Sequence, residues 1–142
     1  MRRPKANDSL IVAGVLNNLG GLHRTQNELP EAHKYFEAAL KNQRSTPATN
    51  VESHASLLAV TLNNLGTILL KQKHKKEARK VFEETLQMVR QFQDKNQDDR
   101  LWVLAYTLDQ LASLDLDDNK PDIARERFEE EVSIRRQLVL RG

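Results

Sequence analysis

Apolar residues recur along this chain at helical spacing, and short polar stretches interrupt them at regular points. In the middle of the sequence, four leucines follow one another at intervals of four, three and four positions, which places them on one face of an α-helix. These leucines are Leu58, Leu62, Leu65 and Leu69. A polar break follows, and a second apolar stripe begins at Ala78. Read along the whole chain, this alternation predicts helices over 8–25, 29–45, 52–72, 75–94, 98–116 and 121–140.

A five-residue segment returns at a constant spacing. Leu-Asn-Asn-Leu-Gly at 16–20 recurs at 62–66, which is 46 positions later, and a weaker copy, Leu-Asp-Gln-Leu-Ala, stands at 108–112. A repeat of this length indicates stacked helical hairpins, because each unit needs its neighbours to bury its apolar face. We therefore predict an all-α fold, an α-solenoid of three hairpins with six antiparallel helices. The predicted organisation is a single domain over 1–142, with repeats at 8–50, 51–96 and 97–142.

Small residues and phenylalanines occupy matching places in the three repeats. The small residues are Gly20, Gly66 and Ala112, and the phenylalanines are Phe36, Phe82 and Phe128. Because protein interiors are close-packed, a missing side chain on one helix leaves room for a large ring on its neighbour. Each phenylalanine is therefore a candidate to fill the space beside the small residue of its own hairpin.

Composition narrows the class of protein further. Hydrophobic residues make up 39% of the chain and charged residues 30%, and there is no cysteine, so disulfides and thiolate metal sites are excluded. No apolar stretch approaches the roughly 18 residues that a membrane span needs. The net charge is only +2, and the basic residues do not gather with aromatics as they do in nucleic-acid domains. We expect a cytoplasmic protein that does not bind membranes or nucleic acids.

The sequence carries no recognisable catalytic or metal-binding signature. It lacks a glycine-rich phosphate loop and a nucleophile elbow. The stretch from Asp115 to Glu126 matches part of a calcium-binding loop, but Lys120 stands where such a loop requires glycine. The four histidines are not paired at the spacing of a zinc site; they are His23, His33, His54 and His74. We therefore expect a binding protein with no catalytic residues, no cofactor and no metal.

The spacing of the repeated residues resembles that of the tetratricopeptide repeat family. That pattern has an apolar residue, then Leu-Gly, then alanine, an aromatic residue and a small residue at fixed distances. The first repeat fits every step, with Leu16, Leu19, Gly20, Ala32, Phe36 and Ala39. The second fits nearly as well, whereas the third has Glu131 where a small residue is expected. The long period and the Leu-Asn-Asn-Leu-Gly segment resemble the kinesin light chain subset of the family.

The resemblance implies a right-handed superhelix whose concave face is lined by the first helix of each hairpin. It also implies recognition of a peptide or a helical segment of a partner protein. Carried over position by position, the concave face would consist of Asn17, Asn18, Gly21, Arg24, Val60, Asn63, Asn64, Thr67, Lys71, Tyr106, Asp109, Gln110 and Ser113. The lysine and arginine clamp of the carboxylate-binding members is missing from these positions, which argues against that subclass.

The asparagine pairs have two interpretations. In related repeats the second asparagine bonds to the main chain of a bound peptide, and Asn18 and Asn64 match that residue. A carboxamide suits this role because it both donates and accepts hydrogen bonds. The alternative is that the asparagines bond across adjacent helices and contact no ligand.

Charge and the chain ends leave further alternatives open. The turn of the second repeat is rich in lysine and that of the third is rich in aspartate, so stacking should bring opposite charges to one edge. The run Glu129-Glu130-Glu131 makes the last helix partly polar, as at the end of a solenoid, while Leu138 and Leu140 remain apolar. Self-association through terminal helices, as a structural arm, and a regulatory sensor segment of a larger protein are the two alternatives to a partner-binding module.

Overall fold

The computed structural model describes residues 6–45, 51–91 and 97–141, and this part of the chain contains six α-helices and no strand. The helices begin and end close to the predicted positions. The end predicted for the fourth helix, 92–94, lies outside the described residues. The observed helices are α1 (Ala6–Thr25), α2 (Leu29–Ser45), α3 (Val51–Lys71), α4 (Lys75–Gln91), α5 (Gln97–Asp117) and α6 (Pro121–Arg141).

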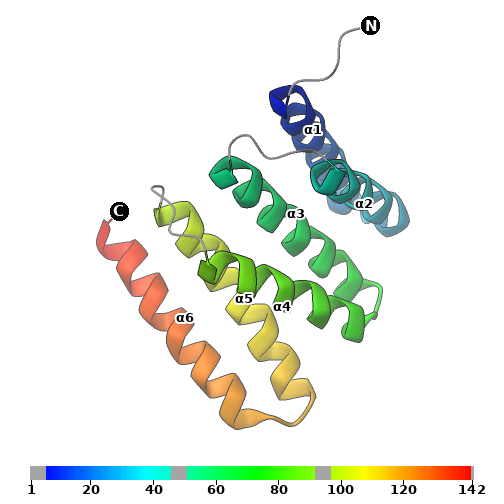
Figure 1. Cartoon of the computed structure of the whole chain (residues 1–142). Coiled ribbons are helices and arrows are strands. Elements are labelled where there is room, and N and C mark those ends of the chain that lie inside the picture. Colours follow the sequence, from blue (N-terminus) through cyan, green and yellow to red (C-terminus); the bar gives the residue numbers. More distant parts are fainter. Residues whose placement is uncertain (1–5, 46–50, 92–96, 142) are drawn as a thin grey trace, which may run out of the picture.

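Consecutive helices pair into three hairpins, which follow one another from α1 to α6 as an α-solenoid (Figure 1). We call α1, α3 and α5 the A helices and α2, α4 and α6 the B helices. The backbone of α3 contacts both α1 and α5, whereas within the described part no B helix makes backbone contact with another B helix. Because the A helices lie closer together than the B helices, the array bends toward its A side.

The turn inside each hairpin has the same geometry. Asn27, Lys73 and Asn119 have φ angles of 59°, 66° and 58°, and they too are 46 positions apart. In the first turn the amide of Glu28 donates to the carbonyl of His23 at 2.8 Å, and equivalent bonds close the other two turns. This is the Schellman arrangement, in which a left-handed residue ends a helix and satisfies its last carbonyls. It reverses the chain within three residues.

The packing of phenylalanine on glycine is confirmed in the first two hairpins. Phe36 and Phe82 are completely buried. A Cβ atom added at Gly20 would lie 2.5 Å from the ring of Phe36, and one added at Gly66 would lie 2.7 Å from the ring of Phe82. The two rings belong to one core cluster that also includes leucines of α5, so the core runs through all three hairpins.

The third hairpin departs from this pattern in two places. Its small residue is Ala112 and not glycine, and Phe128 is only half-buried, unlike Phe36 and Phe82. The prediction that Glu131 belongs to a polar outer face is wrong, because its side chain is turned inward and the residue is 8% exposed. Glu131 occupies the place of buried Ala39 and Thr85 in the other hairpins.

The contact between Gly20 and Phe36 can be tested by adding one methyl group. We expect Gly20→Ala to lower the free energy of unfolding by about 1–3 kcal/mol, because the buried ring has to move. Gly14→Ala is the control, since a Cβ there meets nothing within 4 Å. That variant should gain about 0.5–1 kcal/mol from better helix propensity. Urea denaturation measures both, and equal stability of the two variants would contradict the packing account.

Candidate partner-binding face

The A helices share a solvent-accessible face on the side away from the B helices. On α3 it consists of the exposed Val60 and Lys71 and the half-buried Asn64 and Thr67. Nearly every other described position of α3 is buried or half-buried against its neighbours, because the helix is flanked on three sides. We call this surface, with its continuation onto α1 and α5, the A-helix face.

The continuation onto α1 and α5 contains most of the other predicted residues. Except for Arg24, whose counterpart 46 positions later is the half-buried Leu70, their positions follow from the 46-residue repeat, which puts them at the same angle on each A helix. On α1 these are the exposed Asn18 and the half-buried Gly21 and Arg24; on α5 they are the half-buried Tyr106 and Gln110 and the exposed Ser113. The helices therefore bring together a surface of amides, hydroxyls, one tyrosine and two cations.

Two predicted residues, Asn17 and Asn63, are buried between A helices. The Asn17 Nδ2 atom donates to Thr61 Oγ1 at 2.7 Å, and the Asn63 Nδ2 atom donates to Thr107 Oγ1 at 3.0 Å. Both threonines are fully buried, and each hydroxyl donates to the carbonyl four residues earlier in its own helix. The Thr107 hydroxyl also lies 3.2 Å from Asn63 Oδ1. The first asparagine of each pair thus bonds across adjacent helices. The peptide-binding interpretation concerned the second asparagines, Asn18 and Asn64, and stays a prediction.

Two weaker connections lie nearer the surface. Asn64 Nδ2 is 3.5 Å from Asn17 Oδ1, a distance at which a hydrogen bond contributes little. The hydroxyls of Thr67 and Tyr106 bond to each other across α3 and α5. The A-helix face therefore has a fixed floor of buried bonds, while the amide of Asn64 is only loosely held.

Asp109 stands in the third repeat where the first two have the buried asparagines. It is half-buried, and a carboxylate only accepts hydrogen bonds, so it cannot act as the amide donors of Asn17 and Asn63 do. Asp109 interacts with the inward-turned Glu131. Burial raises the pKa of Glu131 and the carboxylate of Asp109 raises it further, although a hydrogen bond from Arg135 at 2.7 Å opposes the change.

Trp102 is a residue of this region that the sequence analysis missed. Its side chain is 55% exposed on α5, one turn before Tyr106, at the place that Ser56 has in the second repeat. The guanidinium of Arg135 lies 5.9 Å from the centre of the indole ring. Exposed tryptophans are frequent anchors in protein interfaces. The signal was available, since this is the only tryptophan in the chain and it falls on the accessible stripe.

The predicted meeting of opposite charges at the turn edge is confirmed, and it includes a buried carboxylate. Asp115 is 1% exposed and accepts hydrogen bonds from Arg79 of α4 at 2.9 Å and from Arg127 of α6 at 2.8 Å. Arg79 also donates to Asp118 at 2.8 Å. Although partial burial alone would lower the pKa of Arg79, these two carboxylates raise it. Ion pairs therefore hold the second and third hairpins together at the edge formed by their turns.

Comparison with known families agrees with this geometry. The model described as tetratricopeptide repeat matches residues 12–41 and 58–91, which cover most of the first and second hairpins. The first two hairpins are tetratricopeptide repeats. No curated protein gives a match, so the likeness to one subset of the family stays a prediction. The third hairpin lies outside the matched residues, but it shares the helix–turn–helix geometry of the two tetratricopeptide repeats.

The described residues offer neither a membrane-spanning helix nor a metal site. No helix there is long and apolar enough to cross a membrane. No group of three or more metal-ligating side chains is close enough together, in that same part of the chain, to hold a metal ion.

The raised pKa of Glu131 predicts how stability depends on pH. A carboxyl group with a raised pKa in the folded state favours folding when it is protonated, and this contribution is lost as pH rises above the ordinary value of 4.5. Glu131→Thr, which copies Thr85, should therefore be more stable relative to the natural protein at about pH 7 than at about pH 4. Urea denaturation at several pH values measures the difference. The exposed Glu129→Thr is the control, and an equal pH trend in both variants would contradict the assignment.

Proposed function

We propose that this protein is an interaction module that holds a peptide or a helical segment of a partner protein on its A-helix face. The observation that carries the proposal is the arrangement of α3, α5 and α1 around one accessible surface. Its floor is fixed by the buried Asn17–Thr61 and Asn63–Thr107 bonds, and its surface offers amides, hydroxyls and exposed apolar groups. The match of the first two hairpins to the tetratricopeptide repeat supports a protein partner.

The polar groups of this face suit the main chain of a bound segment. Asn18 is exposed, and within the described residues its amide has no hydrogen-bond partner. The amide of Asn64 is held only by the 3.5 Å contact to Asn17, so exchanging that contact for a peptide group costs little. Gln110 provides the same chemistry on α5. Main-chain bonds of this kind give affinity, while side-chain contacts select the sequence.

The apolar groups supply the area that hydrogen bonds alone do not. Val60 is exposed at the centre of the face, and Trp102 and Tyr106 lie one turn apart on the neighbouring helix. Tryptophan and tyrosine lose little conformational freedom when they bind, because each has only two side-chain torsions. An aromatic or aliphatic residue of the partner would pack between Val60 and these rings.

The buried bonds beneath the A-helix face lower the entropic cost of binding a ligand. A surface that is already ordered loses little conformational entropy when a ligand arrives, and affinity rises accordingly. The buried asparagines therefore contribute to recognition indirectly, by holding the helices that carry Asn18 and Asn64. The proposal assigns the protein a scaffold role without catalysis, and the expected compartment is the cytoplasm.

Peptides selected from a random display library on the immobilised full chain test this proposal. Asn64→Ala should weaken the selected peptides by about five- to tenfold, the value of one hydrogen bond, and Trp102→Ala by about tenfold or more. Gln87→Ala removes an exposed amide from α4, outside the A-helix face, and is the matched control. Its affinity should equal that of the natural protein. Isothermal titration measures all four proteins, and circular dichroism checks that each remains helical.

Unchanged affinity in both Asn64→Ala and Trp102→Ala would place the peptides elsewhere on the molecule and contradict the proposal. An equal loss in Gln87→Ala would also contradict it, because that residue shares no surface with the other two.

A further inference from the structure

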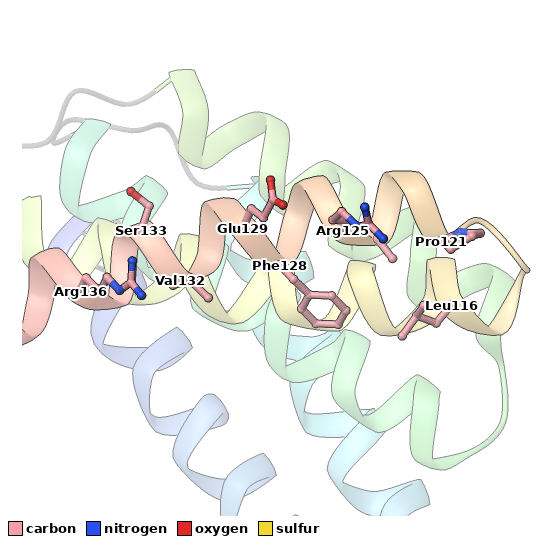
Figure 2. Close-up of a pocket in the computed structure, with 9 residues that line it drawn as sticks. Leu116, Pro121, Arg125, Phe128, Glu129, Val132, Ser133 and Arg136 are labelled. Atoms are coloured by element: carbon pink, nitrogen blue, oxygen red, sulfur yellow. The ribbon is translucent and has the colours of Figure 1, made fainter.

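The outer side of the last hairpin carries an unfilled apolar hollow. A cavity of about 720 Å³ opens along α6 and includes Leu116 at the end of α5. Figure 2 shows the ring of Phe128 between Leu116 and Val132 along this side, with Arg125 and Arg136 on the same helix. Val132 is 47% exposed and Leu116 is 53% exposed. We call this surface the α6 face.

The same surface of the earlier hairpins is covered by the next A helix. Phe82, the counterpart of Phe128, is fully buried in a core cluster with Leu111 and Leu114 of α5. Phe36 is buried in the same way against Leu65 and its neighbours on α3. Within the described residues no helix covers Phe128. The repeat therefore identifies what fits the α6 face, namely a helix that presents two apolar residues three positions apart.

The two arginines of the α6 face correspond to arginines of the second hairpin that form ion pairs. Arg125 is 46 positions after Arg79, which binds Asp115 and Asp118 on the covering helix and its turn. Arg136 is 46 positions after Arg90, which binds Glu130 at 2.9 Å.

In the described part of the chain, Arg125 and Arg136 form no ion pair. Both guanidinium groups are exposed beside the hollow. The partner of Arg90 lies on the next B helix, whereas the partners of Arg79 lie on the covering helix and its turn. By analogy with Arg79, Arg125 therefore needs carboxylates on the helix that fits this face, next to its apolar residues.

We propose that the α6 face docks an amphipathic helix of a partner protein, with acidic residues following its apolar pair as Asp115 and Asp118 follow Leu111 and Leu114. Its apolar side would cover Phe128, Val132 and Leu116, and its carboxylates would meet Arg125. This surface is separate from the A-helix face, and the inference does not depend on the function proposed there.

A second copy of this chain fits the same surface less well. Its α1 would supply Leu19 and Leu22 at the positions of Leu111 and Leu114, and Leu22 is 51% exposed and available. The positions of the two aspartates, however, are held by His23 and Gln26. Neither side chain has a carboxylate to offer Arg125. Charge therefore favours the acidic partner helix over head-to-tail assembly.

A synthetic peptide with the sequence of residues 98–119 tests the inference, because α5 covers the equivalent surface of the second hairpin. We expect it to bind the full chain and to lose about tenfold or more in affinity against Arg125→Glu and against Val132→Asp. Lys80→Glu makes the same charge reversal at an exposed position of α4 and should bind as the natural protein does. A peptide with lysine in place of Asp115 and Asp118 should instead prefer Arg125→Glu. Fluorescence anisotropy measures each affinity.

Equal binding of the peptide to Arg125→Glu and to the natural protein would overturn the proposal, as would absence of binding at millimolar concentration. Sedimentation equilibrium provides the second readout. A natural protein that forms oligomers which Val132→Asp dissociates would show that a second copy covers the α6 face, and this too would overturn the proposal.

Discussion

A buried side-chain bond between consecutive A helices is the interaction on which the rest of this structure depends. Asn17 bonds to Thr61, and Asn63 bonds to Thr107, in each case across 44 positions of the chain. These bonds are made where water is excluded, so a donor or acceptor without its partner would cost about 1–3 kcal/mol. They fix both the spacing and the register of α1, α3 and α5. The closeness of the A helices, and hence the bend of the array toward them, follows from this arrangement.

The third hairpin has a different structure where its residues depart from the repeat. Asp109 replaces the donating asparagine, and Ala112 replaces the glycine on which a phenylalanine packs. Phe128, which no described helix covers, is only half-buried, and Glu131 is turned inward beside Asp109 with a raised pKa. The hairpin that lacks a covering helix in the described structure is also the one that departs most from the repeat. The array therefore has two different surfaces. The A-helix face lies over buried hydrogen bonds, whereas the α6 face is covered by no helix of the described structure.

The repeat and the helical periodicity were enough to predict the six helices and the contacts of Gly20 and Gly66 with their rings, because these depend on local spacing and volume. The same reasoning could not show which of Asn17 and Asn18 is buried between helices and which is exposed. Adjacent residues differ by about 100° around a helix, and which of them is buried depends on where the next A helix lies. The inward turn of Glu131 had the same cause, since its place is set by contacts with α5 and not by its polarity.

The central claim is most directly tested by changing one atom of the buried bond. Asn63→Asp keeps the shape of the side chain but replaces the amide that donates to Thr107 with a carboxylate, which only accepts. The Thr107 hydroxyl lies 2.7 Å from the carbonyl of Val103 and 3.2 Å from Asn63 Oδ1, so it donates mainly to Val103 and leaves the new carboxylate poorly satisfied. The account predicts a loss of about 2–3 kcal/mol in the free energy of unfolding, measured by urea denaturation, while Asn18→Asp at the exposed position changes it by less than about 0.5 kcal/mol. Equal stability of the two variants would contradict the claim that this bond holds the A helices together.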